Sequence, residues 1–235
     1  MKLKEAMAAL EAMGSPAVKI LWLKHGAKEP FFGVKIGDLK PLAKKLKGGQ
    51  ALALELYATG NGDAQYLAGM IADGAQMTAR QLQSWADLAA WRMISATIVP
   101  WVASEHPEGF ALARAWTDSK QEPVAIAGWN TLGALGTILP DDQLPIKELG
   151  ALLDRIPKTL PAAPNRVRQA MNGFVIAIGT YVAPLGDKAI ATARKLGQVE
   201  VDVGDTDCKV PAAVAYIEKV EAMGKLGAKR KTVRC

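Results

Sequence analysis

Apolar residues recur along most of this chain at the spacing of an α-helix, and this periodicity constrains the fold more than any other feature. The stretch GVKIGDLKPLAKKLK, residues 33–47, shows the pattern. Its main apolar positions fall at i, i+3, i+4 and i+7, one face of a helix: Leu39, Leu42, Ala43 and Leu46. We predict a helix over 38–47, with Asp38 as its N-cap and Pro41 in its first turn.

The same spacing continues to residue 223, and prolines and glycines separate the periodic segments. Predicted helices cover 2–13, 16–24, 38–47, 50–59, 62–72, 78–99, 107–118, 122–138, 145–156, 164–182, 185–196 and 211–223. The connections are short, so helices that follow one another should lie antiparallel. Residues 197–211, GQVEVDVGDTDCKVP, are instead predicted to form a loop or a short extended piece.

Pairing these helices gives hairpin units that begin near residues 38, 62, 107, 145 and 185. Helical hairpins of roughly 25–45 residues are the repeating unit of an α-solenoid. No repeat is visible residue by residue, so a compact helical bundle is the alternative. We favour an all-α solenoid of antiparallel helical hairpins, a single curved domain over 1–196. A loop, a terminal helix and a basic tail follow over 197–235.

Basic residues gather towards the two ends of the chain. Residues 1–50 hold ten Lys or Arg and four Asp or Glu, residues 51–160 hold seven and twelve, and residues 161–235 hold twelve and seven. This distribution suits a polyanion held at two basic regions, although basic surfaces also favour solubility. No apolar run approaches the ~20 residues that span a bilayer, and the first residues lack a signal-peptide core. We expect a cytoplasmic protein that does not bind membranes.

Three basic elements are candidates to meet that polyanion. Lys40, Lys44 and Lys47 fall at i, i+4 and i+7 beside the apolar stripe, and we call these three the lysine ridge. Two arginines open the predicted helix 164–182, where a helix N-terminus can also meet phosphate. Residues 224–235 carry five basic residues and no acid, which predicts a flexible basic tail. The alternative for each element is an ordinary solvated surface.

Residues that bind metals or perform nucleophilic catalysis are scarce. The two histidines, His25 and His106, and the two cysteines, Cys208 and Cys235, do not show the paired spacing of zinc ligands. No histidine is placed to activate a cysteine or serine, and no glycine-rich phosphate loop occurs. We therefore expect neither a metal nor a cofactor.

Residues 31–73, FFGVKIGDLKPLAKKLKGGQALALELYATGNGDAQYLAGMIAD, resemble the AlkD-like family of DNA alkylation repair proteins. That family carries a similar Phe-Gly-Val, then Asp-Leu-Lys or Asp-Leu-Arg, then Ala-Lys-Lys. A tryptophan-containing helix follows, here LQSWADLAAWRMISA at 82–96. The resemblance is clearest over 31–100 and thinner to about residue 196. It implies HEAT-like helical repeats that bind duplex DNA and, in active members, a glycosylase that releases cationic alkylated purines.

The resemblance also implies a site made of tryptophans near the deoxyribose and an aspartate. The carboxylate stabilises the positive charge that develops on the sugar as the glycosidic bond breaks. The first tryptophan of the family falls on Trp91 or, in a shifted register, on Trp85. The aspartate one helical turn later would be Ser95 or Ala89, and neither carries a charge.

The two remaining roles of the family site are altered as well. A DNA-holding arginine falls on Ala125 or Ile126, and the second tryptophan falls on Gly173 or Phe174. The phenylalanine would keep an aromatic face. Asp87, four residues before the first tryptophan, is the best local acid to replace the missing aspartate. The predicted catalytic residues are therefore Trp91, Asp87 and Phe174.

We predict a DNA-binding HEAT-like repeat protein whose glycosylase chemistry is altered or absent. One alternative is an active alkylpurine glycosylase with a rearranged site, and another is a scaffold that binds a protein partner through the acids of 105–154. The expected partner is the phosphate backbone of double-stranded DNA, bound by a monomer. The predicted DNA-binding residues are Lys35, Lys40, Lys44, Lys47, Arg92, Arg166, Arg168, Lys229, Arg230 and Lys231.

Overall fold

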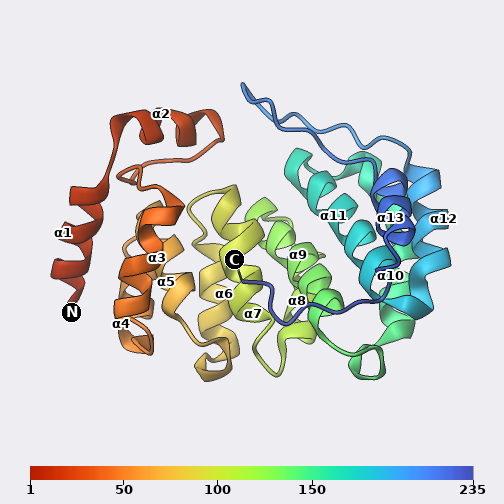
Figure 1. Ribbon diagram of the computed structural model, residues 1–235, viewed down its shortest axis with the longest axis horizontal. Coiled ribbons are helices and arrows are strands. Elements are labelled where there is room, and N and C mark those ends of the chain that lie inside the picture. The colour runs from red at the N-terminus through yellow and green to blue at the C-terminus, as the bar shows by residue number, and fades with distance from the viewer. Residues whose placement is uncertain (235) are drawn as a thin grey trace. The chain divides into compact units, whose positions relative to one another are not determined.

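The computed structural model describes residues 1–234 (Figure 1). Thirteen α-helices and no strand occur in this range, which confirms the all-α prediction. The helices are α1 (Leu3–Met13), α2 (Pro16–Lys24), α3 (Ile36–Lys45), α4 (Gln50–Ala58), α5 (Gly62–Ile71), α6 (Ala79–Asp87), α7 (Val99–Ala103), α8 (Gly109–Trp116), α9 (Glu122–Ile138), α10 (Ile146–Thr159), α11 (Asn165–Tyr181), α12 (Gly186–Leu196) and α13 (Ala213–Ala222). Most predicted ends lie within two residues of the observed ones.

No single helix in residues 1–234 is both long enough and apolar enough to cross a membrane. Two bent helix pairs reach that length and composition only together: Leu3–Met13 with Pro16–Lys24, which bends by 90°, and Asn165–Tyr181 with Ala183–Leu196, which bends by 117°.

The chain folds into two compact units, and the first comprises Met1–Leu112 with Val203–Asp207. In this unit α4 packs against α5, and α1 and α3 pack on α5 as well. Tyr57 of α4 stacks on Trp85 of α6 with ring centroids 3.9 Å apart, and its hydroxyl donates to the Trp85 carbonyl oxygen at 2.6 Å. A buried phenol that finds an acceptor adds both apolar area and a satisfied polar group to the core.

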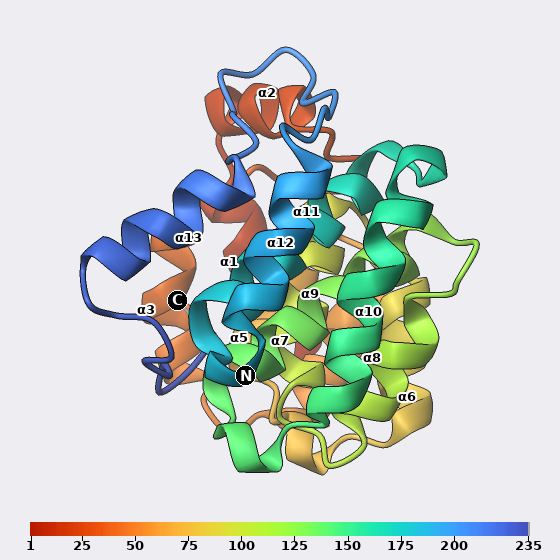
Figure 2. The same ribbon diagram turned by 90° about the vertical axis from the view of Figure 1, so that its right-hand side faces the viewer.

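The second unit comprises Ala113–Asp202 and the residues from Cys208 onward. Here α11 packs against α9, α12 and α13, and α10 packs against α12 (Figure 2). Trp129 of α9 and Phe174 of α11 meet at an angle with ring centroids 5.3 Å apart, an arrangement that aromatic rings prefer. Gly179 lets α13 approach closely, because a Cβ atom there would lie 2.5 Å from Cδ1 of Ile217.

The predicted helix 78–99 is wrong, because the structure interrupts it at residues 88–91. The helix ends with α6, and the continuous chain then forms the π-helical turn η2 (Ile94–Ile98). The buried side chain of Gln65 stabilises the break: its amide group donates to the Leu88 carbonyl oxygen and accepts from the Ala90 N–H, both at 2.8 Å. These bonds give two backbone groups at the break a partner in place of helical bonds.

The start of α3 also differs from the prediction. The helix begins at Ile36 with Lys35 as its N-cap residue, so Asp38 lies in the first turn and Pro41 lies inside the helix. The predicted apolar stripe is confirmed, because Leu39, Leu42, Ala43 and Leu46 are all buried. Lys45 ends the helix, so Lys47 of the lysine ridge follows the helix rather than extending its face.

Residues 197–211 form neither helix nor strand, as predicted. In the second unit, α11 holds both ends of this segment. Asn165 donates to the Asp202 carbonyl oxygen at 2.7 Å and accepts from the Asp202 N–H at 2.8 Å. Asn172 donates to the Pro211 carbonyl oxygen at 2.9 Å. A buried asparagine inside an apolar helix thus anchors the end of this segment.

The prediction of a flexible C-terminal tail is wrong for residues 227–230. The Gly227 N–H donates to the Thr180 carbonyl oxygen at 2.8 Å, and the Arg230 N–H donates to the Thr137 carbonyl oxygen at 2.9 Å. The Lys229 ammonium binds the Gly136 carbonyl oxygen at 2.9 Å and the Asp141 carboxylate at 2.7 Å. This part of the tail therefore belongs to the fold of the second unit.

We expect the Lys229→Ala variant to lose about 1–2 kcal/mol of unfolding free energy, because Asp141 and a carbonyl oxygen lose a cationic donor. Urea denaturation followed by circular dichroism measures the loss. Lys231→Ala is the matched control, because Lys231 is exposed and should change stability by less than about 0.5 kcal/mol. Equal stability of the two variants would show that the tail contributes nothing through Lys229.

Candidate nucleic-acid interface

A buried aspartate fixes the loop that leads into α3. Asn61, a good helix N-cap, accepts hydrogen bonds from the N–H groups of Asp63 and Ala64 and so starts α5. The Asp63 carboxylate then accepts three backbone N–H bonds, from Phe32 at 2.6 Å, Gly33 at 3.0 Å and Val34 at 3.1 Å. One side chain thus positions the residues that precede the helix of the lysine ridge.

Burial raises the pKa of the Asp63 carboxyl above its ordinary value, and the three backbone donors act against this rise. Asp63 is only 6% exposed, and no cation lies within ion-pair distance of it in residues 1–234. Its oxygens already receive the loop N–H groups, so the carboxylate is committed to the loop. We assign Asp63 a positioning role.

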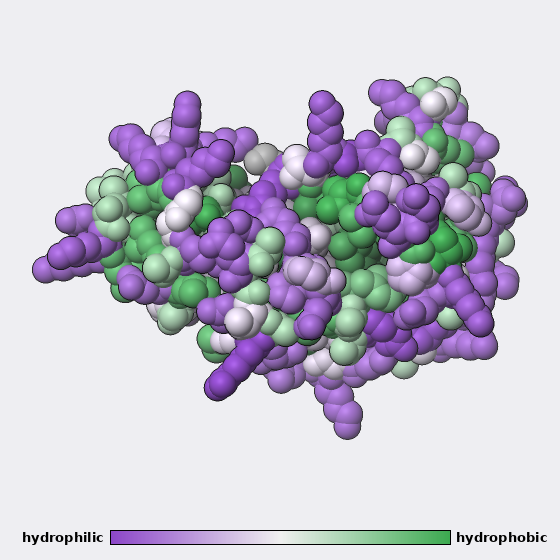
Figure 3. Space-filling model, turned by 90° about the horizontal axis from the view of Figure 1, so that it is seen from below, coloured by the Kyte–Doolittle hydropathy of each residue, from purple (hydrophilic) through white to green (hydrophobic). Residues whose placement is uncertain are grey.

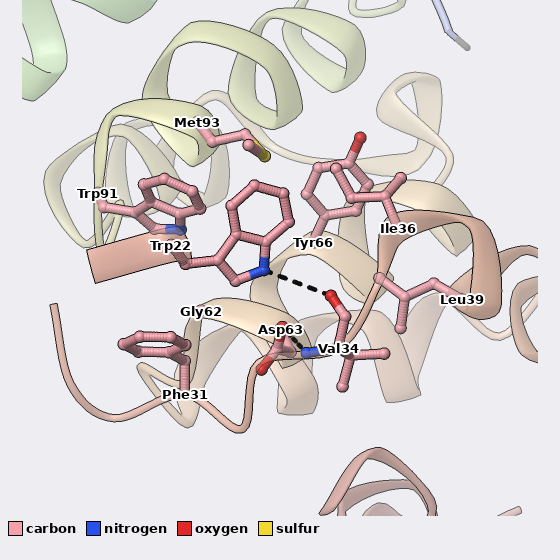
Figure 4. Close-up of a pocket in the computed structure, with 10 residues that line it drawn as sticks. All are labelled: Trp22, Phe31, Val34, Ile36, Leu39, Gly62, Asp63, Tyr66, Trp91 and Met93. Atoms are coloured by element: carbon pink, nitrogen blue, oxygen red, sulfur yellow. Dashed lines mark hydrogen bonds between the residues drawn. The ribbon is translucent and has the colours of Figure 1, made fainter. Parts of the chain in front are cut away.

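Aromatic side chains close the space above this loop (Figure 4). Trp22 of α2 points into it, with its ring centroid 5.7 Å from that of Trp91 and its indole N–H 3.4 Å from the Val34 carbonyl oxygen. The lining residues are Trp22, Phe31, Val34, Ile36, Leu39, Gly62, Asp63, Tyr66, Trp91 and Met93. Only about 10 Å³ of cavity remains, room for one water molecule. The pocket therefore holds the Trp22 side chain and does not accommodate a nucleobase.

The lysines that flank α3 form an exposed basic surface. Lys35, Lys40, Lys44, Lys45 and Lys47 all lie exposed, while the opposite face of the helix is buried. Within residues 1–234 none of the five forms an ion pair. Their charge is therefore not neutralised by the protein, which suits contact with phosphate. Hydrophilic side chains project from much of the face drawn in Figure 3.

Trp91 and Asp87, which were predicted to act together, do not lie on one continuous helix. Trp91 is 9% exposed and packs on Trp22, whereas Asp87 is exposed at the end of α6 and accepts a hydrogen bond from Gln83 at 2.9 Å. The helix ends between these two residues, so they do not share the helical face on which their pairing was predicted. In the shifted register, Trp85 is a core residue beneath Tyr57.

Three of the four remaining family positions lie in the core of the second unit. Phe174 is 1% exposed and packs on Trp129, so its ring faces the core. Ala125 and Ile126 are buried too. Gly173 is exposed, and a Cβ atom there would meet nothing within 4 Å. No aromatic ring therefore stands on this exposed side of α11 at either of the two matching positions.

The arginines and the tail residues that were predicted to contact DNA differ in burial and in their partners within the protein. Arg166 donates to Gln169 at 3.0 Å, Arg168 donates to Asn165 at 3.3 Å, and both side chains are half-buried. Arg92 is half-buried. Arg230 and Lys231 are exposed, while Lys229 is bound to Asp141. The ammonium of Lys229 is therefore held by Asp141. The other residues of this group remain predicted DNA contacts: Arg92, Arg166, Arg168, Arg230 and Lys231.

Two residues that position this surface were not identified from the sequence, Asp63 and Trp22. Asp63 falls in the first turn of the predicted helix 62–72, and no role was predicted for its side chain. An Asn N-cap followed by an acid in the first turn was the available signal. Among residues 1–234 no group of three or more His, Cys, Asp or Glu side chains could hold a metal ion.

Comparison with known proteins gives consistent matches. The family model described as DNA alkylation repair enzyme matches residues 6–201. An uncharacterized protein of Listeria innocua serovar 6a is 32% identical over 216 residues, 89% of this chain and 93% of the relative. An uncharacterized protein of Listeria monocytogenes serovar 1/2a is 31% identical over the same length and shares.

A solved structure matches the whole chain with a TM-score of 0.91 and 37% identity, and the match covers 100% of both chains. That structure represents a new family of proteins related to the HEAT-like repeat DNA glycosylases, with affinity for branched DNA structures. The helical-repeat class predicted from the sequence is thereby confirmed.

Proposed function

Since this chain belongs to the DNA alkylation repair enzyme family, we propose that it binds DNA through the phosphate backbone and prefers branched DNA to plain duplex. The observation that carries the proposal is the exposed lysine surface of α3, which no acid of residues 1–234 neutralises. The preference for branches rests on the affinity described for the family of the matching structure.

The chemistry of α3 supports backbone contact and not base recognition. Lysine ammonium groups meet phosphate as point charges, and each contact releases condensed counterions, so affinity depends on salt but little on sequence. The apolar stripe and the Asp63-held loop fix the helix, so Lys40, Lys44 and Lys45 project from a rigid element. A pre-positioned charge loses less conformational freedom on binding than a charge on a loose chain.

We further propose that base excision is absent or altered in this protein. A glycosylase of this family type needs an anion and an aromatic face beside the cationic sugar. The acid next to the aromatic pocket, Asp63, already accepts three backbone N–H bonds. Asp87 is exposed at the end of α6 and is not on one continuous helix with Trp91, which supports binding without the family chemistry.

Replacing all three residues of the lysine ridge with alanine should weaken binding to a labelled four-way junction about tenfold at 100 mM salt. The slope of log affinity against log salt should become shallower by about 2–3, because up to three phosphate contacts are lost. Fluorescence anisotropy across a salt series measures both quantities.

The matched control replaces three exposed lysines on other helices: Lys147, Lys195 and Lys219. It removes the same net charge, so it separates a specific contact from a general loss of positive charge. If both triple variants weaken binding equally, the lysine ridge is not the contact surface and the proposal fails in this form.

A further inference from the structure

Helix α2 carries apolar side chains on the side that faces solvent. Ile20 is 58% exposed, Leu21 46% and Leu23 49%. Ile20 and Leu23 are three residues apart and share one outward side of the helix, and Leu21 lies next to Ile20 on its other side. Single exposed leucines are ordinary, but three large aliphatic side chains within four residues form a patch.

The inward face of the same helix is firmly attached to the first unit. Val18 is buried, and Trp22 fills the aromatic pocket beside Trp91. The backbone of α2 meets the loop that Asp63 holds: a Cβ atom on Gly33 would lie 2.7 Å from the Lys19 nitrogen. The outward leucines and isoleucine are therefore presented by an anchored helix, and their exposure does not come from a loose chain end.

Three lysines border the patch, and two of them are paired with acids. Residues 16–28 contain three lysines and no acid, and Lys24 and Lys28 are exposed. Lys19 pairs with Glu29 at 2.9 Å and Lys24 pairs with Asp205 at 3.0 Å, both between solvent-exposed side chains. Exposed pairs of this kind contribute little and yield readily to a competing phosphate. An apolar patch with a basic rim fits a ligand that offers an apolar surface bordered by phosphates.

We propose that Ile20, Leu21 and Leu23 of α2 cover the exposed base-pair face at a DNA branch point. The proposal rests on the proposed function and identifies the residues that would give its preference for branches. Bases inside a duplex are stacked on both sides, whereas at a branch the stack is interrupted and apolar base faces become accessible. Aliphatic side chains placed against or between base steps are an established way to exploit such faces.

This arrangement divides the work between two surfaces of the first unit. The lysine ridge meets phosphates that every duplex offers, so it contributes equally to plain and branched DNA. The α2 patch meets a feature that only the branch offers, so it contributes to the difference between the two. Removing the patch should therefore reduce selectivity and leave duplex affinity nearly unchanged.

The test is a variant with Ile20→Gln, Leu21→Gln and Leu23→Gln, since glutamine suits a helix surface and the three side chains are exposed. Anisotropy titrations use a three-way junction and a linear duplex of equal length. We expect affinity for the junction to fall about tenfold and affinity for the duplex to stay within about twofold. The control variant Met223→Gln with Leu226→Gln changes exposed apolar residues of the second unit and should bind like the wild type.

A second readout places 2-aminopurine at the branch point. Wild-type protein should change its fluorescence by altering base stacking there, and the glutamine variant should not. Full junction preference and an unchanged fluorescence response in the variant would overturn the α2 assignment while the proposed function stands. Absence of DNA binding by the wild type would overturn both. Wild-type binding to anionic vesicles but not to junctions would assign the patch to a lipid surface instead.

Discussion

The Asp63→Ala variant is expected to lose about 3–5 kcal/mol of unfolding free energy. The substitution leaves the N–H groups of Phe32, Gly33 and Val34 without their acceptor, and each unsatisfied buried donor costs about 1–3 kcal/mol. Partial entry of water lowers the sum. Urea denaturation followed by circular dichroism measures the change, and the affinity of the variant for DNA should fall as well, because α3 loses its entry loop.

Asp73→Ala provides the matched control, because Asp73 is also an acid at the start of a helical turn. It accepts from the Ala75 N–H at 3.0 Å, but it lies exposed to solvent. Water can replace that acceptor, so the control should lose about 1 kcal/mol or less. A loss of that size for Asp63→Ala would show that the loop does not depend on the buried carboxylate.

The second large effect is expected for Gly33→Ala, at about 3 kcal/mol or more. Gly33 has φ = +83°, and a Cβ atom there would lie 2.7 Å from the Lys19 nitrogen and 2.8 Å from the Ser15 carbonyl oxygen. Left-handed backbone costs about 1–2 kcal/mol for a residue with a side chain, and overpacking against backbone atoms adds about 1–3 kcal/mol. The variant should also shift α2, because both clashing atoms belong to its first residues or to its N-cap.

Gly48→Ala separates the two contributions to this cost. Gly48 has the same φ of +83°, yet a Cβ atom there would meet nothing within 4 Å. Its loss should therefore be only the backbone part, about 1–2 kcal/mol. Thermal or urea unfolding of both variants gives the difference, and equal losses would mean that α2 and the loop are not in tight contact.

Features with a local cause were predictable from the sequence. The buried stripe of α3 and most helix ends follow from apolar spacing and from prolines and glycines within the same segment. The break near Ala90 was not predictable in this way, because it depends on Gln65 of another helix. The attachment of residues 227–230 was missed for the same reason, since their partners are carbonyl oxygens of α9 and α11.

In the candidate site, too, features with a local cause could be predicted and those that depend on distant residues could not. The exposed lysines of α3 could be predicted because charge and helical spacing are visible in the sequence. The role of Asp63 could not, because it is defined by N–H groups about thirty residues earlier in the chain. Phe174 matched a family position by residue type, but the fold turns its ring into the core against Trp129. A residue type at a matching position does not establish which way the side chain faces.

Binding of the wild-type protein to a four-way junction and to a linear duplex across a salt series tests the central claim most directly. The account predicts affinity for the junction about tenfold or more above that for the duplex, and a log–log salt slope of about −3 or steeper for both. Equal affinity for the two DNAs would contradict the preference for branches. Weak binding that does not change with salt would contradict the phosphate-binding role of α3 itself.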